Sequence, residues 1–341
     1  MQRMFKTLLT TVLTLAAAAY AQDRPNIVIF HCHDLGQYLH CYGVKTVSTP
    51  NFDKFAEQGV RFARSFCTQP GCSASRSSLF TGRYPHSNGV MGLTHANFAW
   101  DLNPEEKHLA QFLKEAGYAT VAVGVIHETR SGAQRCGYEK HIRQSKAAEG
   151  TTAAIAELRR LAAGEHPFYL YAGFIEPHRL PYPKDSGPLA GEIGFPGPHL
   201  QPDDSLGVDV PGFLRDTEGT RQELAGLQGA VRHVDEQFGR WLQTLHELDL
   251  EKNTLLIATT DHGIAMPRAK CSVYEPGLQI ALLLRQAGRP NWHSGVVRNE
   301  MVSNIDVLPT VLELAGIPIP ANVQGRSFAP LLDDRPYTPN A

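Results

Sequence analysis

Histidine and carboxylate side chains stand at the ends of four separate apolar runs in the sequence. Each run has the composition of a buried strand, and parallel strands bring their carboxyl ends to one edge of a sheet. Loops converge at that edge, so polar side chains there can act on one ligand. The four endings are HCHD at 31–34, IHE at 126–128, EPHR at 176–179 and TTDHG at 259–263. Together they predict a catalytic or binding site.

The residue types in these endings suit a divalent cation. Asp34, Asp261 and His262 offer oxygen and nitrogen ligands, and the carboxylates favour calcium or magnesium over a soft metal. Each ending taken alone is more typical of a turn or a helix cap. His127 and His178 taken singly are likewise more often structural. It is their joint placement that favours a functional site.

A cysteine and an arginine four residues apart form the second chemical feature. Cys72 and Arg76 are separated only by small side chains, in the stretch GCSASRSSLFTGRYP at 71–85. A disulfide between Cys67 and Cys72 is one interpretation, because an oxidising compartment would permit it. The sequence has no CxxC pair that would indicate a zinc site. This pattern alone leaves the state of the Cys72 sulfur open.

Alternating strand and helix patterns must position these residues. They predict an α/β fold with a mostly parallel central sheet sandwiched by helices, in one domain. Strands are expected at 26–30, 118–127, 167–178, 253–263 and 278–285. Helices are expected at 50–57, from the capping residue Asn103 to 117, from about 221 to 248 and at 306–316. The segment 179–220, rich in Pro and Gly, is expected to be a long surface loop that shapes a pocket.

Composition and the N-terminus limit the class of protein. The 341 residues are 42% hydrophobic and 19% charged, with a net charge of -2 and no basic run, which argues against nucleic acid as a partner. Residues 1–21 have a basic start, an apolar run and a small-x-small ending, which predict a signal peptide and a periplasmic or secreted protein. The apolar run is short for an uncleaved anchor and no second span follows, so no stable membrane anchor is expected. Motifs of serine esterases, zinc proteases and P-loop enzymes do not occur.

The stretch Cys72-Ser73-Ala74-Ser75-Arg76 resembles the signature of the sulfatase family, C-x-[P/A]-x-R. Further similarities follow in the family's order: RPNIVIF at 24–30, DLG at 34–36, EPHR, TTDHG with Lys270 beyond it, and GRSFAPLL at 325–332. The resemblance covers nearly all of residues 22–341. It implies the alkaline phosphatase-like fold and an enzyme that hydrolyses sulfate esters or sulfamates.

The resemblance also implies a role for each residue. A maturing enzyme would oxidise Cys72 to formylglycine, whose hydrated gem-diol attacks sulfur with one hydroxyl and expels sulfate after the second hydroxyl loses its proton. Calcium is the metal usually found in the family, although magnesium or another divalent ion is also compatible; Asp34, Cys72, Asp261 and His262 match its ligands. The other roles are Arg76 for holding the hydrated aldehyde, His127 as its base, His178 for the leaving group and Lys270 for a sulfate oxygen.

Two loops indicate the substrate. GVMGLTH at 89–95 and EPHRLPY at 176–182 most resemble the heparan N-sulfatase (sulfamidase) branch, which implies a sulfated glycan, such as a glycosaminoglycan, as substrate. Two alternatives stay open. One is a phosphate or phosphonate ester hydrolase of the same superfamily, and the other is an inactive homologue that binds sulfated glycan without cleaving it.

Two positions and the length of the chain depart from the family pattern. His33 precedes Asp34 where sulfatases usually have two aspartates, so either one carboxylate is missing or the metal differs. Val125 stands where a lysine usually contacts sulfate, which makes Arg179 a candidate substitute. The sequence stops soon after residue 332, so we expect it to lack the C-terminal subdomain that helps to wall the family's substrate pocket.

Overall fold

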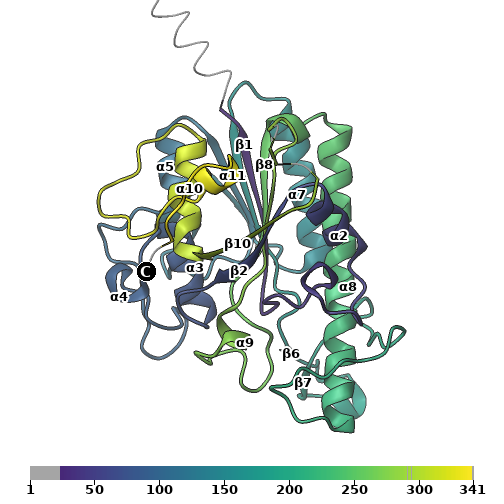
Figure 1. The fold of residues 1–341 in the computed structure, drawn as a ribbon. Helices are drawn as coiled ribbons and strands as arrows, with labels where there is room; N and C mark the ends of the chain where they lie inside the picture. The colour runs from purple at the N-terminus through teal and green to yellow at the C-terminus, as the bar shows by residue number, and fades with distance from the viewer. Residues whose placement is uncertain (1–23, 290, 293, 340–341) are drawn as a thin grey trace, which may run out of the picture.

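A computed structural model describes residues 24–289, 291–292 and 294–339 of the chain. Its centre is an eight-stranded sheet with the strand order β10-β2-β9-β8-β1-β5-β3-β4 (Figure 1). The strands are β1 (Asn26–Cys32), β2 (Val60–Phe66), β3 (Ala119–Gly124), β4 (Lys140–Ile142), β5 (Phe168–Gly173), β8 (Thr254–Thr260), β9 (Leu282–Arg285) and β10 (Val296–Ser303). A small second sheet pairs β6 (Leu180–Pro181) with β7 (Ile193–Gly194). The predicted signal peptide, residues 1–21, lies outside the described residues.

The central sheet is parallel except at one strand. β1, in the middle, pairs in parallel with β5 on one side and with β8 on the other. β9 runs antiparallel to both of its neighbours, β2 and β8. Every residue of β1 is buried because helices cover both faces of the sheet. The expected class, α/β with a mostly parallel sheet between helices, is therefore confirmed.

Helices form a layer on each face of the sheet (Figure 1). On one face lie α2 (Pro50–Glu57), α7 (Ala147–Ala162) and α8 (Glu218–Glu247). On the other face lie α3 (Cys72–Thr81), α5 (Leu109–Glu115), α10 (Val307–Leu314) and α11 (Ala329–Leu332). Short helical turns complete the fold: η1 (His40–Tyr42), α4 (Pro85–Asn88), α6 (Ala133–Cys136), η2 (Gly187–Leu189), η3 (Glu251–Asn253), α9 (Glu275–Leu278) and η4 (Asn304–Asp306).

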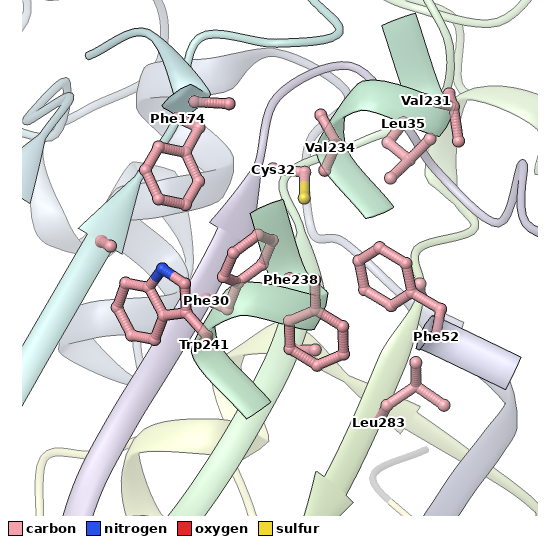
Figure 2. Close-up of a cluster of buried hydrophobic side chains, with 14 of the residues drawn as sticks. Phe30, Cys32, Leu35, Phe52, Phe174, Val231, Val234, Phe238, Trp241 and Leu283 are labelled. Carbon is pink, nitrogen blue, oxygen red and sulfur yellow. The ribbon is translucent and has the colours of Figure 1, made fainter. Parts of the chain in front are cut away.

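Aromatic side chains fill the core between β1 and α8 (Figure 2). The ring of Phe30, in β1, lies 4.8 Å from that of Phe238 and 5.6 Å from that of Trp241, measured between centroids. Phe52, from α2, stacks on Phe238 at 4.4 Å. Aromatic pairs at these spacings each stabilise the core by about 0.5–1.5 kcal/mol beyond the area that they bury. This packing makes the sheet a rigid frame for the loops at its ends.

The start of α5 differs from the sequence prediction. The helix begins at Leu109, and the ring of His108, rather than the side chain of Asn103, accepts the backbone N–H of Ala110 at 3.0 Å. The backbone between 103 and 106 is instead held by Arg135, whose guanidinium donates to three of its carbonyl groups. The hydrogen bonds from Arg135, which is distant in sequence, therefore determine the backbone conformation here, and the predicted cap at Asn103 does not form.

Some of the other elements match the sequence predictions, and others were not predicted. α2 has the predicted bounds, β1 begins at the predicted residue, and α8 begins three residues earlier than predicted because Thr217 caps it. β2, β10 and α7 were not predicted. The segment that leads to α8 contains little besides the two-residue strands β6 and β7, which confirms a long loop there.

No helix in the described part of the chain combines the length and the hydrophobicity needed to cross a bilayer.

Candidate active site

The four polar strand endings meet at one edge of the sheet. Asp34 follows β1, His127 follows β3, His178 follows β5 and Asp261 follows β8. α3 begins at Cys72 on the same edge, because β2 runs in the same direction as β8. The structure thus brings together every site residue that the sequence predicted, including Arg76, His262 and Lys270, through the contacts described below.

Two carboxylates occupy the centre of the site, and both are fully buried. Asp261 accepts the backbone N–H groups of Asp34 and His262, both at 2.9 Å. Burial would raise the pKa of Asp34, but the hydrogen bond from His33 and the charges of His33 and His262 lower it below its usual range. Burial likewise opposes ionisation of Asp261, and its neighbours His262, His33 and Arg76 outweigh that effect and lower its pKa. Both groups are therefore anions in the folded chain.

His33 bridges the two carboxylates. Its Nδ1 lies 3.0 Å from Asp34 Oδ1 and 3.1 Å from Asp261 Oδ2. Burial lowers the pKa of His33 to about 4 in spite of these anions, so the ring is neutral near pH 7. Carboxylates only accept hydrogen bonds, so Nδ1 carries the proton and Nε2 carries the lone pair. That Nε2 is buried and has no hydrogen-bond partner among the described residues.

The tautomer of His262 indicates a place for a cation. Its Nδ1 lies 2.9 Å from the carbonyl oxygen of Gly263, which can only accept, so Nδ1 is a donor and only Nε2 is left to face the carboxylates. Nε2 faces Asp34 Oδ1 at 3.2 Å and Asp261 Oδ1 at 3.7 Å, and it has no hydrogen-bond partner in the part of the chain that the structure describes. A nitrogen so close to two anionic oxygens requires positive charge between them, which a metal cation or a proton on Nε2 can supply. The residues present therefore fit a divalent metal.

Cys72 and Arg76 lie one helical turn apart at the start of α3. Cys72 is 4% exposed, and burial, followed by the charge of Asp261, raises the pKa of its thiol to about 11. Arg76 is fully buried and donates from Nε to Asp261 Oδ2 at 3.2 Å and from Nη1 to the hydroxyl of Tyr171 at 2.6 Å. The Tyr171 hydroxyl donates in turn to the carbonyl of Val125 at 3.0 Å. The guanidinium is therefore fixed beside residue 72.

Lys270 and His178 form the more open side of the site, with 23% and 28% of their side chains exposed. Lys270 Nζ donates to Asp34 Oδ2 at 2.7 Å and to His178 Nε2 at 3.1 Å. The ring of His178 donates from Nδ1 to the carbonyl of Arg179 at 2.6 Å, which leaves Nε2 as the acceptor. Burial disfavours the ammonium group, but Asp34 outweighs burial and raises the pKa of Lys270. Lys270 is thus a fixed cation beside an anionic oxygen.

His127 lies between two other imidazole rings. Its centroid is 5.3 Å from that of His33 and 5.3 Å from that of His95, which stands on the loop after α4. Burial, followed by the charges of Arg76 and His33, lowers the pKa of His127 to about 2. The buried Nδ1 finds no hydrogen-bond partner within the described ranges. The backbone N–H of His127 donates to Glu128 at 2.8 Å, which holds the residue in place.

Sequence reasoning missed several residues that support the site. Tyr171 lies inside a buried strand and nothing local to it indicates a contact with Arg76. Glu128 was part of a predicted polar ending, but its hydrogen bond to His127 was not foreseen. Asn304, at the start of η4, donates from Nδ2 to the carbonyl and hydroxyl oxygens of Ser75 in α3. These residues hold the groups on which the chemistry depends.

Two interpretations drawn from the sequence are wrong. Cys67 and Cys72 are both free thiols, and Cys67 Sγ points to the carbonyl of Gly277 at 3.8 Å, so the disulfide does not form. Arg179 does not replace the missing lysine in the site, because its guanidinium donates to Glu223 at 2.5 Å and to the carbonyl of Ile193 at 2.9 Å. These contacts hold Arg179 against α8 and β7.

Comparisons with known proteins agree on a family. Residues 25–317 match the family model described as Sulfatase. The chain is 28% identical over 335 residues to N-sulphoglucosamine sulphohydrolase of Homo sapiens, and the match covers 91% of this chain and 66% of the relative. It is 28% identical over 322 residues to an ulvan-active sulfatase of Formosa agariphila, with coverage of 92% and 58%. The chain therefore spans less than two thirds of the length of these relatives.

Solved structures agree with the fold. A protein in complex with its substrate D-glucosamine-2-N,6-O-disulfate superposes with a TM-score of 0.71 at 20% identity, covering 92% of this chain and 81% of that one. The shared architecture is the alkaline phosphatase-like fold expected from the sequence. With the family match extending over most of its length, this chain belongs to the sulfatase family.

Proposed function

We propose that this chain hydrolyses sulfate esters or sulfamates of sulfated carbohydrates, with residue 72 acting as formylglycine. One observation carries the proposal: Cys72 and Arg76 stand against the buried pair Asp34 and Asp261, with Lys270 at the open side, in a member of the sulfatase family. Hydrated formylglycine would supply an oxygen nucleophile at that position.

A divalent metal is part of this proposal, as in the family generally. Asp34, Asp261, His262 and the converted residue 72 would hold it, and we propose calcium, with magnesium or another divalent ion as the alternative. Such a cation supplies Lewis acidity next to the sulfate group. The unpaired Nε2 of His262 between two carboxylate oxygens supports its placement.

The charges of the side chains suit a sulfate group. Asp34 and Asp261 contribute two negative charges, which Arg76 and Lys270 balance. A bound divalent cation would then leave the site with an excess of two positive charges, which suits the monoanionic sulfate ester or sulfamate and the sulfate dianion that is released. Arg76 would hold the oxygens of residue 72, and Lys270, already directed at an anionic oxygen, would bind an oxygen of the substrate.

The two partly open imidazoles would handle protons. His127 is neutral at physiological pH, and its unpaired Nδ1 can accept a proton from a hydroxyl at residue 72. Burial and the charge of Arg76, which lower the pKa of His127, also keep the ring unprotonated before reaction. His178 stands beside Lys270 on the exposed side and would serve the departing oxygen or nitrogen.

An N-sulfated glycan, such as a glycosaminoglycan, is the proposed substrate. Similarity to N-sulphoglucosamine sulphohydrolase, and the fold shared with a protein bound to a disulfated glucosamine, support this choice. The predicted signal peptide supports export to a periplasm or the outside of the cell, after or during conversion of Cys72 by a maturing enzyme.

Inorganic sulfate release from a panel of sulfated glycosaminoglycans, with calcium present, tests the proposal. Trypsin should release residues 65–76, and the mass of that peptide reports whether Cys72 is an aldehyde. We expect the converted chain to release sulfate and Cys72→Ala to release none. A faster rate on aryl phosphate than on aryl sulfate would favour the phosphate ester alternative. Glycan binding that survives Cys72→Ala, without any sulfate release from the converted parent, would favour the inactive homologue.

A further inference from the structure

Three side chains outside the carboxylate pair form a second donor cluster around residue 72. His33, Cys72 and His127 each offer one ligand atom, and these atoms all lie within 4.8 Å of one another. They come from the end of β1, the start of α3 and the loop after β3. His33 and Cys72 are buried, and His127 is half-buried.

We propose that the unconverted chain, with its thiol intact at Cys72, binds one zinc-like transition-metal ion through His33, Cys72 and His127. This inference goes beyond the proposed sulfatase activity, because it concerns the chain before conversion.

The unpaired nitrogens of the two imidazoles are the first support for this site. His33 uses Nδ1 between two carboxylates, which leaves Nε2 without a partner, and the buried Nδ1 of His127 also lacks one among the described residues. Buried polar atoms in folded proteins almost always have partners. Each ring of this cluster therefore keeps one nitrogen that a ligand shared with the Cys72 sulfur can use.

The donor types are the second support. Two imidazole nitrogens and one sulfur form a ligand set for zinc that leaves a fourth position for water, whereas calcium and magnesium prefer oxygen ligands. His33 makes this set possible, since an aspartate at that position would offer no nitrogen. When the ion binds, the S–H bond of Cys72 breaks, its proton passes to solvent, and a metal–sulfur bond forms without any change of oxidation state.

Another cluster of the same residue types is closed to such an ion. His108, Glu128 and Cys136 are all buried and also lie within ligand distance of one another. His108, however, uses Nδ1 to accept the N–H of Ala110 and Nε2 to contact Glu128 at 3.2 Å. Neither ring nitrogen is left for a metal, so Cys136 serves as an internal comparison.

Cobalt titration of the unconverted full chain tests the proposal. The chain would be produced without a maturing enzyme, and the mass of peptide 65–76 would confirm the thiol. We expect one equivalent of Co²⁺ to give a thiolate-to-cobalt charge-transfer absorption band, which Zn²⁺ then removes. Cys72→Ser should abolish the band, and His127→Gln should weaken binding by about 10-fold or more.

Two variants serve as matched controls. Cys136→Ser removes a buried thiol from the closed cluster, and Cys271→Ser removes the exposed thiol next to Lys270; both should keep the band. A band that survives Cys72→Ser, or no band with the folded wild-type chain, would overturn the proposal. If Cys72→Ser fails to fold, the change in alkylation rate when Zn²⁺ is added to the wild-type chain decides the matter. Zn²⁺ should slow alkylation of Cys72 by a larger factor than that of Cys271, and an equal factor at both thiols overturns the proposal.

Sulfate release distinguishes this proposal from the proposed function. A converted chain that releases sulfate, with no band from its unconverted form, would refute the zinc site alone. A band from the unconverted chain, with no sulfate release from the converted one, would support the zinc site and refute the sulfatase activity.

Discussion

Two buried aspartates, Asp261 at the end of β8 and Asp235 in α8, have opposite surroundings. Asp235 accepts the backbone N–H groups of Asn51 and Phe52 at 3.1 and 2.9 Å and the side-chain amide of Asn51 at 2.8 Å. These are N–H groups of the first turn of α2, whose own N-cap residue, Thr49, makes no side-chain capping bond in the described structure. Asp235 is therefore a helix cap supplied by another helix.

The pKa shifts of the two residues differ in sign. Burial raises the pKa of Asp235 to about 6, because its partners are neutral N–H donors. Asp261 is buried as deeply, but His262, His33 and Arg76 lower its pKa. The N–H groups around Asp235 all donate hydrogen bonds to it. In contrast, several polar atoms around Asp261 have no hydrogen-bond partner among the described residues. The comparison indicates that a buried carboxylate with a structural role receives hydrogen bonds from all of the polar groups around it. A buried carboxylate that binds a ligand has neighbours whose polar atoms lack hydrogen-bond partners within the chain.

The largest expected effect is on the Asp261 side of this comparison. Asp261→Asn keeps the size of the side chain but removes a charge that faces Arg76 and the proposed metal. We expect sulfate release by the converted chain to fall about 1000-fold or more. We also expect calcium to raise the melting temperature of the wild-type chain but not of the variant, because a ligand that binds only the folded state stabilises it.

The matched control is the same substitution in the other region. Asp235→Asn should leave the rate of sulfate release and the calcium-induced shift unchanged, because α8 holds it far from the reacting groups in its role of capping α2. A variant with Asn at 261 that keeps both the wild-type rate and the wild-type shift would break the comparison.

Asp235→Ala should destabilise the fold without affecting the site. It leaves the first N–H groups of α2 unpaired in a buried setting, and we expect the free energy of unfolding to fall by about 2–3 kcal/mol. Urea denaturation followed by circular dichroism measures this loss. Glu236→Ala, at the next and exposed residue of the same helix, should change stability by about 0.5 kcal/mol or less. Equal losses in the two variants would show that Asp235 is not a cap.

The raised pKa of Asp235 predicts a pH dependence with a definite sign. Between its ordinary value of 3.8 and about 6, the folded chain binds the proton more tightly than the unfolded chain. The free energy of unfolding should therefore fall as the pH rises through this window, relative to that of Asp235→Asn, by about 1–2 kcal/mol. Parallel urea titrations of both proteins from about pH 4 to about pH 7 measure the difference. A constant difference across that range would contradict the raised pKa.

The same contrast separates what the sequence could predict from what it could not. The polar endings of β1, β3, β5 and β8 were predictable, because parallel strands share an edge and the pattern is local to each strand. The contacts of the structural residues, such as Asp235 and Tyr171, could not be predicted. Asp235 lies in an amphipathic helix where no neighbouring residue distinguishes it. Phe52, in the helix that it caps, stands 183 residues earlier in the chain. Tyr171 looks like any residue of a buried strand until Arg76 is placed beside it.

The strands β2 and β10 escaped prediction for a related reason. β2 reads VRFARSF and β10 reads VVRNEMVS, and charged residues interrupt their apolar pattern on the partly exposed faces. Their pairing with each other, across most of the chain, supplies the stability that the local pattern does not show. The prediction of the start of α5 was wrong for the same reason, because contacts of Arg135 and His108 outweighed the capping pattern at Asn103.

The smallest expected effect compares a local helix cap with the distant one. Thr217 caps α8 from the residue directly before it, and its hydroxyl accepts the N–H of Thr220 at 3.2 Å in an exposed turn. Thr217→Ala should lower the free energy of unfolding by about 0.5–1 kcal/mol, because water can replace the lost acceptor there. Thr217→Ser keeps the hydroxyl and should restore most of the loss. If Thr217→Ala lowers the free energy of unfolding as much as Asp235→Ala does in the same urea titration, burial is not what makes the Asp235 cap strong. The comparison of the two aspartates would then depend only on the surroundings of Asp261.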